Sequence, residues 1–329
     1  MRSSMHVVVS LAALAVGLSA CRSIAPPPAV IHSPNIVGVI SPRPFQRWQS
    51  AYRLQNKEIE VVVVPETGRI HSLSEPEGSS LLWQNDVLGS HLNLSERMHA
   101  TTDGIAFGVD LDNVAAADAP ELLQSWESKA WINEDGSQAC HLTRTLPAPH
   151  DLAQSLLITL DADSPQLIVM HRITSMGASR IKVHPFAAIY VPPDLDCLLP
   201  GNFYTPAWAK DVLELQHCER TTLCGIQQEG NSYETPLSNA WMANMQSSHA
   251  LSLQQLYVPP SSETITNAWG RFSRFDGHAE MRLIGASVDL LPAQTHEVRY
   301  RIRMHEVVDW PNRCDSAAHL ESRILKRTP

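Results

Sequence analysis

Apolar and polar residues alternate along most of the chain between residues 47 and 309, and almost no run follows a helical period. In segment 296–305 apolar side chains occupy one face and arginines the other, as a strand requires: Val298, Tyr300, Ile302 and Met304 against Arg299, Arg301 and Arg303. Turn residues separate the other predicted strands, 58–64, 69–73, 105–111, 139–145, 155–161, 166–174, 180–191, 251–258, 264–275 and 279–290. Many strands with few crossover helices predict one antiparallel all-β sandwich over residues 47–310.

The first 20 residues have the layout of an export signal. Arg2 supplies a positive charge, residues 7–18 form a mostly apolar run, and small residues precede Cys21. The run is shorter than the roughly 20 residues of a spanning helix. The segment ending in Cys21 resembles the bacterial lipobox, which implies that Cys21 is lipidated and becomes the first residue of the mature chain. The alternative is an ordinary secreted protein with a cysteine near the cut.

Residues 21–46 follow as a proline-rich segment, with prolines at positions 26, 27, 28, 34, 42 and 44. Such a sequence favours extended, semi-rigid conformations, so we expect a tether between the lipid and the sandwich. In similar lipoproteins, an aspartate directly after the cysteine signals retention at the inner membrane. This chain has Arg22 at that position, which favours location at the outer membrane, facing the periplasm.

The charge balance excludes one class of partner. The full chain carries a net charge of −9, and removal of the signal takes away one cation, Arg2, which leaves −10. Nucleic-acid binding depends on neutralising phosphates with basic residues. We therefore expect no nucleic-acid partner, and a bilayer contacted through acylated Cys21 instead.

Five cysteines remain once Cys21 is lipidated, in a compartment where disulfides persist. Cys218 and Cys224 enclose five residues, which is short enough for a hairpin disulfide. The rival is a metal site with His217, but it lacks a fourth ligand at a recognised spacing. Asp110, Asp112 and Asn113 lack the glycine and the terminal glutamate of a calcium loop. No metal and no cofactor are expected.

The tail, residues 311–329, is polar and carries no pattern typical of catalysis. Residues 315–325 can form one amphipathic helix, begun by Asp315 or Ser316. We expect it to lie outside the sandwich domain.

Several short motifs resemble galactose mutarotase-like (aldose 1-epimerase-like) proteins. They are Pro65-Glu-Thr-Gly-Arg-Ile70, Leu81-Leu-Trp-Gln-Asn85, the strand with Arg144, the strand with His184, and the closing segments 279–283 and 291–304. The resemblance covers about residues 47–304. It implies a supersandwich of two large antiparallel sheets whose concave face, in similar proteins, holds a sugar.

A mutarotase needs a general acid and a general base at the anomeric carbon, commonly a histidine and a glutamate. His184 shares an alternating face with Phe186 and Tyr190, which makes it the candidate acid; Glu280 is the candidate base. A half-buried structural histidine is the alternative for His184. The resemblance does not supply a recognisable acidic partner, so the sequence favours binding without catalysis.

Candidate ligand contacts lie in a polar loop after Trp83 and in aromatic residues near turns. The loop contributes His91, Arg97, His99 and Asp103, and Arg69 stands in the resembling motif. Trp269 lies beside a turn signal, where its ring can stack on a sugar. The alternatives are a solvated loop with chance histidines and a tryptophan that only packs.

Three functions follow from these patterns. The first is a membrane-anchored, periplasm-facing lipoprotein that binds a carbohydrate without catalysis. The second is a sugar mutarotase or epimerase that uses His184. The third is a structural or assembly lipoprotein of the cell envelope that has the sandwich without a sugar site.

Overall fold

The computed structural model describes residues 35–84, 103–111, 126–146, 150–193, 196–201, 213–226, 230–246, 248–256, 268–275, 277–307 and 312–325. Internal contacts separate residues 1–34 from a second unit, residues 35–329, which holds all of the described residues. The predicted signal segment and Cys21 therefore lie outside the described residues.

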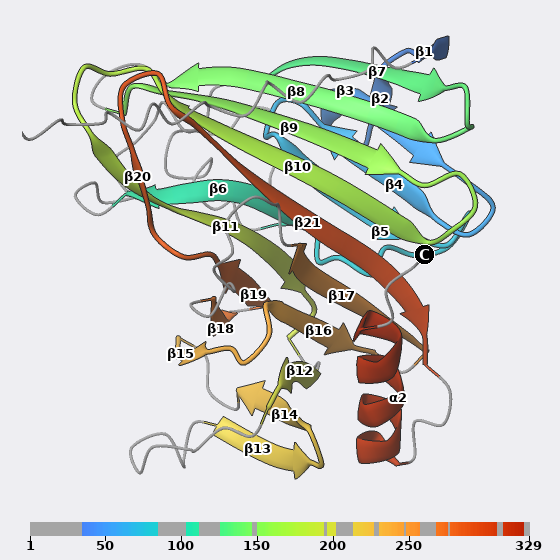
Figure 1. Ribbon diagram of the computed structural model, residues 1–329. Helices are drawn as coiled ribbons and strands as arrows, with labels where there is room; N and C mark the ends of the chain where they lie inside the picture. The colour runs from blue at the N-terminus through green and yellow to red at the C-terminus, as the bar shows by residue number, and fades with distance from the viewer. Residues whose placement is uncertain are drawn as a thin grey trace, which may run out of the picture. The chain divides into compact units, whose positions relative to one another are not determined.

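Two large sheets build this unit, and every strand pairing in them is antiparallel (Figure 1). The first has 11 strands in the order β1-β7-β8-β9-β10-β21-β17-β16-β12-β14-β13. In chain order they are β1 Ile36–Ile40, β7 Glu127–Asn133, β8 Gln138–Leu146, β9 Leu152–Leu160, β10 Gln166–Ser175, β12 Asp196–Pro200, β13 Leu213–Cys218, β14 Thr221–Ile226, β16 Trp241–Met245, β17 His249–Leu256 and β21 Thr295–Glu306.

The second sheet has 10 strands in the order β15-β18-β19-β11-β6-β5-β4-β3-β2, with β20 paired to β11. They are β2 Arg43–Phe45, β3 Trp48–Gln55, β4 Glu60–Val64, β5 Arg69–Ser74, β6 Ile105–Leu111, β11 Ile181–Val191, β15 Ser232–Pro236, β18 Trp269–Phe275, β19 His278–Ile284 and β20 Val288–Leu290. The predicted all-β sandwich of antiparallel sheets is confirmed.

The main core lies between the two sheets, and strict alternation supplies it. In β9 every second residue is buried, and Leu156, Ile158 and Leu160 join the core, while the residues between them stay half-buried. Leu283 from β19 and Ile189 from β11 bring the other sheet into the same cluster. Each such leucine or isoleucine contributes roughly 1.5–3 kcal/mol by leaving water, which fixes the register of every strand.

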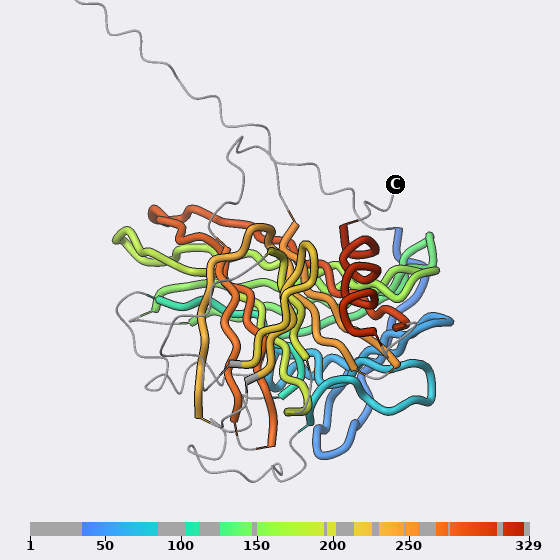
Figure 2. Tube along the Cα trace, turned by 90° about the horizontal axis from the view of Figure 1, so that it is seen from below, coloured from blue at the N-terminus to red at the C-terminus, as the bar shows by residue number. Residues whose placement is uncertain are grey.

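The described helix, α2 (Arg313–Leu325), packs on the 11-stranded sheet at its β12–β17 end (Figures 1 and 2). Ala317, Leu320 and Ile324 are buried against Trp241 and Met245. The predicted helix is confirmed, but its expected place outside the domain is wrong, because these three apolar side chains form one stripe. Among the described residues, no helix has the length and apolar character to cross a membrane.

Residues 35–46 also differ from the prediction, which made them part of the tether. They contain the edge strands β1 and β2, and Ile40 packs against the main core. The reason is the alternating run Ile36-Val-Gly-Val-Ile40, which pairs with β7 despite the flanking prolines. The sequence analysis also does not predict strands β3 and β7 or the short strands β12–β16. The predicted segment 279–290 is broken at Gly285 into β19 and β20.

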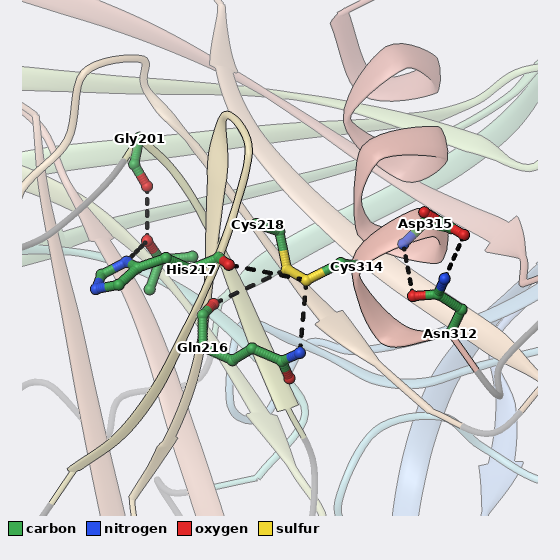
Figure 3. The surroundings of a disulfide bond; sticks show 8 residues. Gly201, Gln216, His217, Cys218, Asn312, Cys314 and Asp315 are labelled. Atoms are coloured by element: carbon green, nitrogen blue, oxygen red, sulfur yellow. Dashed lines mark hydrogen bonds between the residues drawn. A yellow bond between two sulfur atoms is a disulfide. The ribbon is translucent and has the colours of Figure 1, made fainter.

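The disulfide joins Cys218 to Cys314, 96 residues apart, and not to Cys224 (Figure 3). The predicted hairpin bond is wrong because Cys218 and Cys224 face opposite sides of the sheet. Cys218 lies with Leu223 under α2, whereas Cys224 points into the main core. Cys140, Cys197 and Cys224 are buried free thiols. The disulfide fixes the first turn of α2 to the β13–β14 hairpin.

Candidate functional site

The 10-stranded sheet turns one face to the core and the other, here called the ten-strand face, away from it. Ala187 and Ile189 of β11 belong to the core, so alternation points Phe186, Ala188 and Tyr190 outward. The outward residues of the neighbouring strands β6 and β19 continue the same surface.

Cross-strand pairing gathers charged side chains around Tyr190. Glu280 stands directly opposite Tyr190, and Arg282 stands opposite Ala188. On the other side of β11, Asp110 lies opposite His184. We call the resulting group the outer site; it consists of Arg69, Asp110, Phe186, Tyr190, Glu280 and Arg282.

Arg282 is the centre of the outer site. Its Nε donates to Glu280 Oε1 at 2.5 Å, and its Nη1 lies 3.5 Å from Asp110 Oδ2. Its guanidinium carbon lies 4.2 Å from the centre of the Phe186 ring. Burial lowers the pKa of Arg282, but Glu280, Tyr190 and Asp110 together outweigh burial and raise it. Arg282 is therefore a fixed cation held by two carboxylates and an aromatic ring.

Tyr190 is only 4% exposed and lies against this ionic group. Burial raises the pKa of its hydroxyl, and the charge of Glu280 raises it further, while Arg69 and Arg282 act in the opposite direction. The phenol therefore stays protonated at neutral pH. It can act as a hydrogen-bond donor or acceptor, and not as a base.

Arg69 approaches the same ring from β5. Its guanidinium carbon lies 5.5 Å from the centre of the Tyr190 ring, and its Nη1 donates to the carbonyl oxygen of Asp103 at 2.8 Å. Two glycines place it. Gly68 and Gly104 both have φ near +65°, and a Cβ at Gly104 would lie 2.2 Å from the carbonyl oxygen of Ile70. Neither position accepts another residue without strain.

A buried polar group contacts Arg69 through the carbonyl oxygen of Asp103. Asp103, which is 1% exposed, contacts Arg47 Nη2 at 3.2 Å and His71 Nδ1 at 3.4 Å. Burial, then the charges of Arg69 and Arg47, hold the pKa of His71 well below its usual range. The imidazole is therefore neutral at pH 7, and its contact with Asp103 is not an ion pair.

Aromatic rings border the outer site on the β18 side. His278 stacks between Trp83 and Phe275, with ring centres 4.3 and 4.8 Å apart, and lies 5.9 Å from the Tyr190 ring. Phe275 is 37% exposed. The site thus combines flat apolar rings with fixed charges, which can pack against apolar faces and hydrogen-bond polar groups of a ligand.

The structure does not bring the two predicted catalytic residues together. His184 and Tyr190 are six residues apart on β11, and Glu280 lies opposite Tyr190. At about 3.3 Å per residue, His184 is roughly 20 Å from Glu280 along the strand. One anomeric carbon cannot contact both side chains. Glu280 is also 5% exposed and engaged by Arg282.

The other predicted ligand residues are distributed unevenly. Arg69 belongs to the outer site, whereas Asp103 is buried and contacts this site through its carbonyl oxygen, which accepts from Arg69. Trp269 lies on the same face, opposite Ile284 of β19, and is 44% exposed. His91, Arg97 and His99 lie outside the described residues, as does Cys21.

Sequence reasoning missed Tyr190 and Arg282, which are central here. Tyr190 had been placed only as a neighbour of His184 on the alternating strand. The signal that could have found Arg282 is the segment Glu280-Met-Arg282, in which two opposite charges alternate with a buried methionine. Among the described residues, no three His, Cys, Asp or Glu side chains are grouped as a metal site would need.

No family model matches the sequence, and no curated protein matches it. Solved structures do match the fold. A candidate aldose 1-epimerase from Escherichia coli K12 superposes with a TM-score of 0.56 and 12% identity, over 78% of this chain and 99% of that one. A galactose mutarotase-like protein from Lactobacillus casei ATCC 334 superposes with a TM-score of 0.53 and 10% identity, over 78% of this chain and all of that one. The described residues have a galactose mutarotase-like fold.

Proposed function

We propose that this protein is a lipid-anchored protein of the cell envelope, at the outer membrane and facing the periplasm, whose outer site binds a carbohydrate or glycan without catalysis. The observation that carries the binding part is Arg282, held between Glu280 and Asp110 beside Phe186 and Tyr190. The galactose mutarotase-like fold supports the same class of ligand.

The geometry supports recognition better than turnover. Epimerisation moves one proton onto the ring oxygen and another off the anomeric hydroxyl, so it needs two titrating groups within reach of one carbon. Glu280 is paired with Arg282, and His184 is roughly 20 Å away along the strand. Arg282 and Asp110, whose side chains are 17% and 36% exposed, instead present fixed donors and acceptors to a bound molecule.

A glycan array with the full chain carrying Cys21→Ser tests binding. We expect at least one glycan to bind, and Arg282→Gln to abolish that binding because both carboxylates lose their partner. Arg53→Gln is the matched control, since Arg53 pairs with Glu60 on the same sheet and is 58% exposed. An empty array, or equal binding by both variants, would refute the proposal and favour a structural or assembly role.

Polarimetry on several aldoses tests the absence of catalysis. We expect anomer interconversion at the uncatalysed rate. Catalysis lost in Glu280→Gln would contradict the non-catalytic assignment and identify Glu280 as the base.

Metabolic labelling with palmitate tests the anchor independently. The sequence ending at Cys21 supports acylation, and Cys21→Ser should remove the label. Unlabelled wild-type protein would contradict the anchor without bearing on sugar binding.

A further inference from the structure

The outward side of the 11-stranded sheet, here called the eleven-strand face, carries a row of arginines from its central strand. In β21 the residues Val298, Tyr300 and Ile302 enter the core. Strand β21 lies between β10 and β17 (Figure 1), and its alternate positions point away from the core because side chains alternate along a strand. These positions are Glu297, Arg299, Arg301 and Arg303.

Two of these arginines have no acidic partner among the described residues. Arg299 contacts Glu297, which is shared with Arg172. Within the described part of the chain, Arg301 and Arg303 form no ion pair, and the Nε atom of each is buried without a hydrogen-bond partner. In a chain whose net charge is −9, two adjacent unneutralised arginines are a local reversal of sign.

The pKa shifts of Arg301 and His305 reflect burial and the positive potential around this pair. Burial lowers the pKa of Arg301, and the charge of Arg303 lowers it further. His305 stands next along the same side, where burial, Arg303 and Arg323 lower its pKa to about 3. An anion bound beside these arginines would reduce the repulsion between them.

Apolar side chains alternate with the arginines across the neighbouring strands. Ile168 and Met170 of β10 stand opposite Arg301 and Arg299, and Leu256 of β17 stands opposite Arg299 from the other side. All three are half-buried. The same side continues to the edge strand β1, where Val39 is 80% exposed. Mixed arginine and aliphatic side chains suit the boundary between headgroups and acyl chains.

We propose that the eleven-strand face, centred on Arg301 and Arg303, docks on the surface of an anionic phospholipid bilayer. The choice of a bilayer rests on the anchor part of the proposed function. Cys21 is 15 residues before Ile36 of β1, which is a reach of at most roughly 50 Å. A lipid anchor would therefore keep this sheet within reach of the headgroups, and docking through the eleven-strand face would leave the ten-strand face toward the aqueous side.

Vesicle sedimentation with the full chain carrying Cys21→Ser tests the face without the anchor. Vesicles of phosphatidylcholine with phosphatidylglycerol should bind the chain, and vesicles of phosphatidylcholine alone should bind it far less. Adding Arg301→Gln and Arg303→Gln should lower the partition coefficient about 25-fold, since each arginine near an anionic surface contributes about fivefold. The matched control, Arg43→Gln with Arg53→Gln, removes two charges from the other sheet.

Equal binding to both kinds of vesicle, or equal loss in both variants, would overturn the proposal. Binding to a soluble acidic polysaccharide such as polygalacturonate, with none to anionic vesicles, would overturn it in favour of an acidic glycan partner. A thermal melt of each variant checks that the sheet is intact. Palmitate labelling and the glycan array report on the proposed function separately, so its failure is distinguishable from failure of this face to bind.

Discussion

The two outward faces of the sandwich differ in how their central arginines are paired. On the ten-strand face, Arg282 contacts Glu280 and Asp110, and Arg271 contacts Glu234 at 2.9 Å. On the eleven-strand face, Arg301 and Arg303 lie on the same side of β21 without an acidic partner among the described residues. Both faces belong to sheets of similar size around one core, so the fold alone does not impose the difference.

The two faces differ in whether their arginines already have an acidic partner. Charges that are already paired can orient a small neutral ligand through hydrogen bonds, because they need no counter-charge from it. Unpaired charges favour a partner that brings its own negative charge. We infer that a neutral glycan fits the ten-strand face and an anionic surface fits the eleven-strand face.

The largest expected effect comes from releasing the helix that covers one end of the eleven-strand face. Cys218→Ala with Cys314→Ala removes a cross-link over 96 residues and should lower the free energy of unfolding by about 4 kcal/mol. Urea unfolding measures this loss, and the reduced wild-type protein should match the variant. A change below about 1 kcal/mol would mean that packing of Leu320 and Ile324 alone fixes α2.

Glu280→Gln should break the pairing on the ten-strand face. It leaves Arg282 partly buried with only Asp110, at 3.5 Å, so we expect a loss of about 2–3 kcal/mol in unfolding free energy. Arg301→Gln should be neutral or slightly stabilising, because it removes repulsion from Arg303. Equal destabilisation by the two changes, measured by chemical denaturation, would remove the contrast between the faces.

Lowering the pH should decrease the stability of the folded protein through protonation of His305 on the eleven-strand face. The pKa of this imidazole is about 3 when folded and near 6.5 when unfolded, so the unfolded state binds more protons between those values. Its contribution to stability is complete above about pH 6.5 and falls as pH decreases toward 3. At pH 5 the loss is about 2 kcal/mol. His305→Gln should remove that part of the pH dependence, seen in melts at pH 7 and pH 5; an unchanged slope would contradict this assignment.

Local pattern predicted most of the long strands, because alternation alone decides which side chains of β9, β11 or β21 meet the core. The candidate site could not be predicted as well. Tyr190 and Glu280 are 90 residues apart in the sequence and meet only through the β11–β19 register. Cys218 and Cys314 can form a disulfide because α2 packs on the sheet, and the polar tail sequence does not indicate that packing.

The most direct measurement is isothermal titration of one array-selected glycan into three proteins. The first is the chain carrying Cys21→Ser, the second adds Arg282→Gln to it, and the third instead adds Arg301→Gln and Arg303→Gln. The account predicts binding that is lost with Arg282→Gln and unchanged in the form that alters the eleven-strand face. Binding that survives Arg282→Gln, or that disappears when Arg301 and Arg303 are changed, would contradict the assignment of the ligand to the ten-strand face.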